Sequence, residues 1–267
     1  MRDKRGNTIL LLQDFSLERL IHNSRLFANR FRVVSYPRSG RTWLRVMLHD
    51  LRLDPRFTHA ASKPGLALTP AQMLAYNRRL HDQRILHLVR EPRDVMVSYY
   101  HHLTASGRWQ GSLKDMIRDE RHGFARILAF DQAVRRDRAN YRSYLEMSYE
   151  AMRADPVAGL TAVTRFLGAR HLPEPRIRQV VAAYEFSKMK EKERSGELAK
   201  RFGARFVSGT DSDSAMTVRR GVIGGYADML DDEDLAYCDA LLERYGQTTG
   251  AQAPRPALQR KLAAAAG

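Results

Sequence analysis

The sequence is poor in cysteine and in long apolar segments. Cys238 is the only cysteine among 267 residues, which excludes an intramolecular disulfide and a cysteine-based metal site. No apolar run approaches the roughly 20 residues of a membrane-spanning helix, and near the N-terminus only residues 9–12 form a continuous apolar patch. We therefore expect neither secretion nor a membrane anchor, and a reducing, cytoplasmic location.

Acidic residues are also scarce, which gives the chain a strong positive charge. Lysine and arginine number 45 against 30 aspartates and glutamates, so the formal net charge is +15. This balance favours an anionic partner such as a nucleic acid, a membrane surface or a polyanionic cofactor. The alternative is a soluble protein with a merely basic surface, because many arginines, including those of residues 135–138, fall in a predicted solvated helix.

The 43% hydrophobic content is enough for one large α/β core. We expect a single domain over residues 1–267, in which residues 1–30 are a lead-in to the first strand and residues 250–267 a frayed tail.

One stretch, residues 31–51, predicts a phosphate-binding turn. A short β-branched run at residues 33–34 indicates a buried strand, and the polar turn PRSGRT (37–42) then leads directly into a helical pattern. The first backbone N–H groups of a helix have no partner within the helix, so an anion held there gains several hydrogen bonds. Further donors, charge and a flexible backbone would come from Arg38, Ser39, Gly40, Arg41 and Thr42.

The turn departs from the nucleotide-binding P-loop, Gly-x-x-x-x-Gly-Lys-Ser/Thr, at two positions. Ser35 stands at the first glycine and Arg41 at the lysine. On this motif alone, a polar strand-to-helix turn without a ligand is the competing interpretation.

A second strand is predicted at residues 84–89, followed directly by Arg90 and by a helix over residues 92–103. A magnesium-dependent kinase or NTPase usually has an acidic residue at the end of such a strand. An arginine there suits bidentate capture of a phosphate, so this strand end would hold a second anionic group directly. Another basic, glycine-containing turn follows at residues 219–225 (RRGVIGG).

The remaining pattern alternates strands and helices. We predict a short strand at 55–59, helices at 71–80, 115–138, 157–168, 175–184 and 235–245, an element of undecided type at 141–152, and a mobile or lid segment at 191–214.

Three of these segments resemble, in the same order, the motifs of the sulfotransferases that use 3′-phosphoadenosine 5′-phosphosulfate (PAPS). Residues 36–43 (YPRSGRTW) resemble the family's 5′-phosphosulfate loop, residues 90–100 (REPRDVMVSYY) its 3′-phosphate motif, and residues 219–224 (RRGVIG) its Arg-Lys-Gly-x-x-Gly loop. Weaker matches lie at residues 149–152 (YEAM) and 186–190 (FSKMK). The resemblance implies an α/β fold of the P-loop-NTPase-like, three-layer type, with a central, mostly parallel sheet flanked by helices.

The resemblance also implies PAPS as cofactor, adenosine 3′,5′-bisphosphate as product, and no metal. Arg38 stands in place of the family's leaving-group lysine, and His59, after Thr58, in place of its general base. A lysine that precedes this pair in the family is Phe57 here. The implied cofactor-binding residues are Arg38, Ser39, Gly40, Arg41, Thr42 and Trp43 for the 5′-phosphosulfate, Arg90, Ser98, Arg219, Arg220 and Gly221 for the 3′-phosphate, and Trp43, Tyr149 and Phe186 for adenine.

Some of these assignments have alternatives. The three aromatic residues of the adenine set would also fit as ordinary core residues. His101 and His102 are the fallback candidates for the base. Arg41 stands where the family usually has a small hydroxyl residue.

The predicted function is transfer of a sulfuryl group from PAPS to a hydroxyl or amine of a small molecule such as an alcohol, phenol, sugar or lipid. A divergent magnesium-dependent P-loop kinase or NTPase is the alternative. A third hypothesis, a basic nucleic-acid-binding protein, lacks any recognisable reading module, so we expect no nucleic-acid partner.

Overall fold

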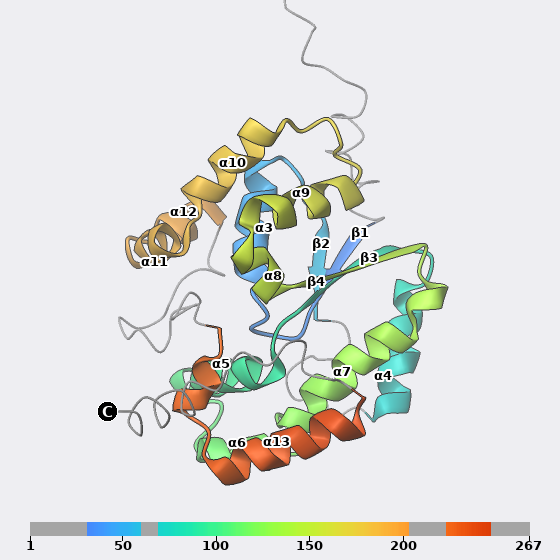
Figure 1. Cartoon of the computed structure of the whole chain (residues 1–267), viewed down its shortest axis with the longest axis vertical. Helices are drawn as coiled ribbons and strands as arrows, with labels where there is room; N and C mark the ends of the chain where they lie inside the picture. The colour runs from blue at the N-terminus through green and yellow to red at the C-terminus, as the bar shows by residue number, and fades with distance from the viewer. Residues whose placement is uncertain (1–30, 60–68, 203–222, 247–267) are drawn as a thin grey trace, which may run out of the picture.

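The structure, a computed structural model, describes residues 31–59, 69–202 and 223–246. Its centre is a parallel sheet with the strand order β2-β1-β3-β4 (Figure 1). The strands are β1 (Phe31–Val34), β2 (Arg56–Thr58), β3 (Arg84–Val89) and β4 (Ser143–Ser148). Val34 of β1 lies opposite Thr58 of β2 and His87 of β3. Because β1 and β3 are parallel neighbours, the segments that follow them leave the sheet at the same edge.

Helices cover both faces of the sheet (Figure 1). One face carries α3 (Arg41–Asp50), α8 (Tyr149–Ala154), α9 (Pro156–Phe166), α10 (Glu174–Ala183), α11 (Phe186–Arg194) and α12 (Glu197–Phe202). The other carries α4 (Pro70–Asn77), α5 (Pro92–Ala105), α6 (Leu113–Arg118), α7 (Phe124–Arg136) and α13 (Asp232–Arg244). The predicted three-layer α/β arrangement is thus confirmed.

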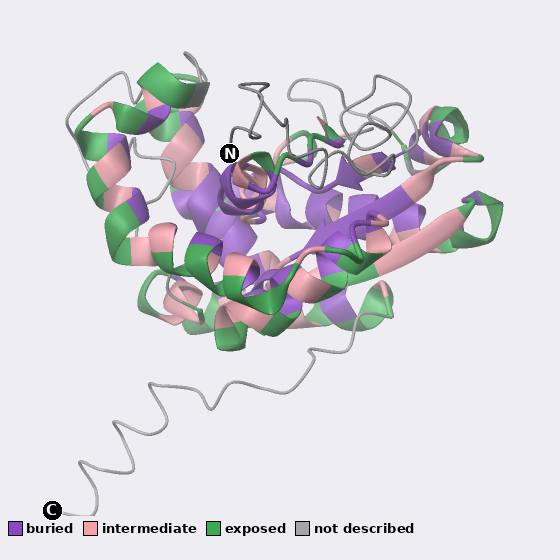
Figure 2. Ribbon diagram, turned by 90° about the horizontal axis from the view of Figure 1, so that it is seen from above, coloured by how far each residue is buried: buried purple, intermediate pink, exposed green. Residues whose placement is uncertain are grey.

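Successive side chains of a strand point to opposite faces of the sheet, so the core consists of two apolar clusters, one on each face. Val33 and Leu86 pack into the cluster under α3, whereas Val34 and Ile85 pack into the cluster under α5 and α7. The buried strand residues belong to β1 and β3, and Figure 2 shows further buried residues on the helices. This burial holds the strand ends, and therefore the loops beyond them, in fixed relative positions.

α3 is buried more than a surface helix would be. Trp43, Leu44, Val46, Met47 and Leu48 are all buried, as its two apolar rows predict. Each such side chain contributes about 1.5–3 kcal/mol when fully removed from water, so α3 is firmly anchored behind the turn that precedes it.

The predicted single helix over residues 115–138 is wrong. The chain forms two helices, α6 and α7, separated by a turn in which one Asp119 oxygen accepts the backbone N–H groups of Arg121 (2.8 Å) and His122 (2.6 Å). A Cβ on Gly123 would lie 2.2 Å from the Asp119 carbonyl oxygen, so this close turn requires glycine. Side-chain competition for backbone donors ends the first helix.

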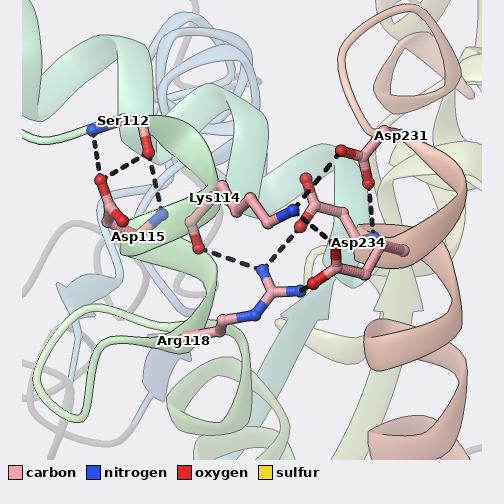
Figure 3. A network of polar contacts seen from close by, with 7 residues as sticks. Ser112, Lys114, Asp115, Arg118, Asp231 and Asp234 are labelled. Carbon is pink, nitrogen blue, oxygen red and sulfur yellow. Dashed lines mark hydrogen bonds and ion pairs between the residues drawn. The ribbon is translucent and has the colours of Figure 1, made fainter.

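A polar network joins α6 to the C-terminal helix α13 (Figure 3). Arg118 donates to Asp234 at 2.6 Å and to Glu233 at 3.2 Å, and Lys114 donates to Glu233 at 2.6 Å. Asp231 caps α13 by accepting the backbone N–H of Asp234 at 2.8 Å. These bonds fix α13 against α6 within the layer that contains α5.

Two further segments have a definite secondary structure. The undecided segment 141–152 divides into strand β4 and the start of helix α8. The segment 191–214, predicted as mobile or a lid, is helical as far as residue 202, in α11 and α12, and its remainder lies outside the described residues. Among the helices described, none is long and apolar enough to cross a membrane.

Candidate functional site

The turn between β1 and α3 has the geometry of an anion cradle. Arg38 (φ 73°) and Gly40 (φ 86°) both adopt left-handed backbone conformations, which turn the chain sharply into the helix. Gly40 forms the N-cap without a side-chain hydrogen bond, and the first turn of α3 contains no acidic residue. The positive end of this helix is therefore directed at the turn with no carboxylate of its own to offset it.

Gly40 is also pressed against a neighbouring helix. A Cβ at this position would lie 2.4 Å from Cδ2 of Tyr149, the first residue of α8. Any side chain here would push Tyr149 away from the turn. The close approach explains why this position requires glycine for space as well as for its positive φ.

The structure brings the first two predicted motifs into contact. Nε of Arg38 donates to Oγ of Ser98 at 3.1 Å, although the two residues are 60 positions apart. Nη1 of Arg90 donates to the carbonyl oxygen of Arg38 at 3.2 Å, across 52 positions. The guanidinium of Arg90 also lies 4.7 Å from the ring centre of Tyr149. Thus the turn after β1, the end of β3 and the first residue of α8 form one cluster.

The end of the third motif reaches the same cluster through a residue that the sequence analysis did not assign. Asp94 is buried and accepts the backbone N–H groups of Gly224 (2.8 Å) and Tyr226 (3.0 Å). Its carboxylate lies 3.9 Å from Arg90. Burial raises the pKa of Asp94, while Arg90 and the two amides act in the opposite direction. An acid four residues after Arg90, in the first turn of α5, was the signal available in the sequence.

The three predicted residues of that motif itself, Arg219, Arg220 and Gly221, lie outside the described residues. Gly224, three residues after Gly221, is described and is held by its hydrogen bond to Asp94.

The predicted aromatic residues form a second cluster beside the turn. The ring of Trp43 stands edge-on to Tyr149, with 6.1 Å between the ring centres, and its Nε1 donates to the carbonyl oxygen of Tyr184 at 2.7 Å. Phe186 is half-buried at the start of α11. The guanidinium of Arg153, which the sequence analysis did not assign, lies 5.8 Å from the Trp43 ring and 5.4 Å from the Phe186 ring. Its position four residues after Tyr149 on α8 was the available signal.

His59 follows β2 and lies against the opening of the turn. Its Nδ1 is 2.9 Å from the carbonyl oxygen of Ser35. Burial and then the charge of Arg41 lower the pKa of His59 to about 4, with a smaller contribution from Arg45, while the bond to Ser35 acts in the opposite direction. His59 is therefore neutral near pH 7. A carbonyl can only accept, so Nδ1 carries the proton and the lone pair is on Nε2.

The fallback histidines, His101 and His102, have other ring contacts than His59. His102 lies one helical turn after Ser98, and its Nε2 is 2.8 Å from Nη2 of Arg108, which can only donate. Burial, followed by the charges of Arg38 and Arg108, lowers the pKa of His102 to about 4. Its ring is neutral, but the Nε2 lone pair is already used by Arg108. His101 packs its ring against Tyr100.

A cavity of about 360 Å³ lies at the opposite end of α3, lined by His49, Asp50, Arg52, Arg176 and Arg201. Arg176 donates to the carbonyl oxygen of Asp50 at 3.0 Å, and Arg201 donates to the Asp50 side chain. Arg176 thus caps the C-terminal end of α3, about 15 Å along the helix axis from the turn. This cavity is therefore separate from the cluster of motifs.

Comparisons with known proteins agree with this geometry. A luciferin sulfotransferase from Photinus pyralis is 29% identical over 130 residues, which cover 46% of this chain and 33% of that protein's length. Cytosolic sulfotransferase 17 from Arabidopsis thaliana is 24% identical over 284 aligned positions, covering 88% of this chain and 80% of that protein.

Two solved structures share the fold. Mouse sulfotransferase SULT7A1 complexed with PAP superimposes with a TM-score of 0.63 at 17% identity, covering 86% of this chain and 92% of that chain. Retinol dehydratase in complex with androsterone and the inactive cofactor PAP gives a TM-score of 0.59 at 19% identity, with 88% and 87% covered.

The sequence profile of the sulfotransferase domain matches residues 50–251. This range includes Arg90, Ser98 and the basic glycine turn, and it begins after the turn at residues 36–43. The predicted resemblance is confirmed: the chain belongs to the sulfotransferase domain family.

Proposed function

We propose that the protein transfers a sulfuryl group from PAPS to a hydroxyl or amine of a small-molecule acceptor. The observation that carries this proposal is the contact of two anion-binding segments, in which Arg38 bonds Ser98 and Arg90 bonds the backbone of Arg38. Such a pair suits a nucleotide with anionic groups at two positions of one ribose. Two solved structures with the same fold are named as complexes with PAP, which supports the choice of nucleotide.

The residues present fit this cofactor chemically. The exposed amides at the start of α3 and the side chains of residues 38–43 suit the 5′-phosphosulfate, because they supply donors and positive charge without a carboxylate. Arg90 and Ser98, together with Arg219, Arg220 and Gly221, would hold the 3′-phosphate. Trp43, Tyr149 and Phe186 would hold the adenine by stacking.

PAPS, when bound, would supply the sulfuryl group. Arg38 would neutralise negative charge on the phosphate side of the turn, where charge develops during transfer. Because guanidinium stays protonated, Arg38 would act by its charge and its hydrogen bonds and would not donate a proton. Its bond to Ser98 holds the side chain against α5. No metal is needed in this proposal, since arginine occupies the strand end where a magnesium enzyme usually has an acid.

His59 would accept the proton of the acceptor hydroxyl at Nε2. A pKa of about 4 is low for a base at neutral pH, and Arg41 is the second cause of it after burial. An anion held at the turn would offset the charge of Arg41 and raise the pKa of His59 toward the operating pH. Cofactor binding and base strength would therefore be coupled through Arg41.

The nucleotide preference can be tested by thermal unfolding. Adenosine 3′,5′-bisphosphate at 100 times its dissociation constant should stabilise the protein by about 2.7 kcal/mol, a rise in Tm of roughly 5–10 °C for a domain of this size. ATP with magnesium is the matched comparison. A larger shift with ATP and magnesium would overturn the proposal in favour of a P-loop kinase or NTPase.

The chemistry can be tested with labelled PAPS and a panel of alcohols, phenols, sugars and lipids. His59→Asn should lower kcat by about 10²–10⁴-fold while the affinity for the bisphosphate stays within twofold. Equal activity of His59→Asn and the wild type would exclude His59 as the base.

We also propose that residues 1–267 act as one domain and that the protein works in the cytoplasm, in keeping with its single cysteine.

A further inference from the structure

Arg153 lies beside the aromatic cluster, and no motif assigns it a role. It is on α8, four residues after Tyr149, so both side chains leave the same face of the helix. Its guanidinium lies 5.8 Å from the ring centre of Trp43 and 5.4 Å from that of Phe186. Both distances are within the range of cation–π attraction, which holds the guanidinium over these two rings.

The polar atoms of Arg153 are incompletely satisfied in this position. Its Nε is buried and has no hydrogen-bond partner among the described residues. A buried donor without a partner is costly, and arginine cannot lose its proton to reduce that cost. The aromatic neighbours Trp43 and Phe186 have no strong acceptor in their rings. A bound molecule that carries an acceptor and packs beside these rings would satisfy this donor.

A purine base has the matching chemistry. Its flat π-system stacks on aromatic side chains and on guanidinium planes, and its ring nitrogens N1, N3 and N7 accept hydrogen bonds in adenine. A phosphate alone would not gain from the rings of Trp43 and Phe186. The surroundings of Arg153 therefore favour a base over the anionic end of the nucleotide.

We propose that Arg153 is a specificity-determining residue that donates a hydrogen bond from Nε to a ring nitrogen of the adenine. The inference rests on the proposed PAPS-dependent function and deepens it, because it names a residue that recognises the base. Two other roles would also involve the positive charge of Arg153 or its contacts: general attraction of a polyanion, or packing between α8 and α11. The test must separate these roles from recognition of the base.

A thermodynamic cycle tests the proposal: the Arg153 side chain is removed from the protein, the adenine is removed from the ligand, and the two changes are made separately and together. Arg153→Met keeps a long unbranched side chain and removes both the charge and the donors. Binding of adenosine 3′,5′-bisphosphate and of ribose 3,5-bisphosphate, which lacks the base, is measured by calorimetry for the wild type and the variant. Arg165→Met is the matched control, because Arg165 is an exposed arginine on the neighbouring helix α9.

Arg153→Met should lower the affinity for adenosine 3′,5′-bisphosphate by about tenfold or more, which corresponds to about 1.4 kcal/mol. Its affinity for ribose 3,5-bisphosphate should change less than twofold, and Arg165→Met should leave both affinities within twofold. Equal losses for the two ligands would show that Arg153 acts only through its charge, and unchanged or tighter binding of the adenosine ligand would also overturn the proposal.

A second variant covers the case in which Arg153→Met unfolds. Arg153→Lys keeps the charge but lacks the Nε–H donor and the planar fork, so it should also lose affinity only for the ligand that carries the base. Wild-type affinity in Arg153→Lys would refute the proposal. The wild-type titrations separate this outcome from failure of the proposed function, which would appear as no binding of adenosine 3′,5′-bisphosphate to the unmodified protein.

Discussion

Replacing Arg41 by glutamine should raise the pKa of His59. The free protein holds this pKa at about 4 instead of 6.5, a difference that corresponds to about 3 kcal/mol. Burial is the largest cause and Arg41 the second, so Arg41 lowers the pKa by less than burial does. In Arg41→Gln we therefore expect the pKa of His59 to rise by about one unit, which is the size of a charge interaction of about 1.4 kcal/mol.

The measurement is an NMR titration of the histidine Cε1 protons, in which His59→Asn assigns the resonance. Arg45→Gln is the matched control, because Arg45 is the smallest contributor to the pKa of His59 and should change it less than Arg41 does. The reasoning is refuted if Arg41→Gln leaves the pKa at the wild-type value, or if Arg45→Gln raises it more. In the wild type, adenosine 3′,5′-bisphosphate should raise the same pKa, and Arg41→Gln should reduce that rise.

The same titration has a consequence for stability. Because the pKa of His59 is lower in the folded chain than in the unfolded chain, protonation favours unfolding. The stability linked to His59 is complete above pH 6.5 and is lost as the pH falls toward 4. Urea unfolding at a series of pH values should show a smaller decrease over this window in His59→Asn than in the wild type.

Other substitutions test the contacts that build the site. Gly40→Ala should destabilise the fold by about 1–3 kcal/mol and abolish binding of adenosine 3′,5′-bisphosphate, because the new Cβ would meet Tyr149 at 2.4 Å and φ is +86°; urea unfolding and calorimetry measure the two effects. Asp94→Ala should lower the affinity for the same ligand by about tenfold, because two backbone amides lose their acceptor; unchanged calorimetric affinity would contradict the anchoring role. Ser98→Ala should weaken binding by about 3–10-fold through loss of its bond to Arg38, with no change in Tm beyond about 2 °C.

The sequence predicted the elements whose signals are local. Strand β3 was expected at residues 84–89 and is found at Arg84–Val89, because an apolar run is bounded by charged residues on both sides. The buried helix α3 was predicted from two apolar rows for the same reason. The adjacency of the turn and Arg90 followed from the family resemblance and is explained by the parallel pairing of β1 with β3.

Features that depend on distant contacts were not predictable in this way. Asp94 acts through backbone amides that lie 130 and 132 positions further along the chain. The role proposed for Arg153 depends on its contacts with Trp43 and Phe186, which belong to two other helices. The break between α6 and α7 depends on one carboxylate that accepts two backbone donors, a choice that helical periodicity does not reveal.

The strand order has a consequence for how such an enzyme can diversify. The parallel pairing of β1 with β3 brings Arg38 to Arg90 across the 51 residues that separate them. Within this interval, residues 39–43 and His59 belong to the proposed site, whereas the chain between His59 and β3 does not. Insertions or deletions between β2 and β3, after His59, would leave the proposed site intact, provided that β2 still pairs with β1. New acceptor preferences can therefore evolve in the excursion between the two strands while the donor half of the reaction is inherited unchanged.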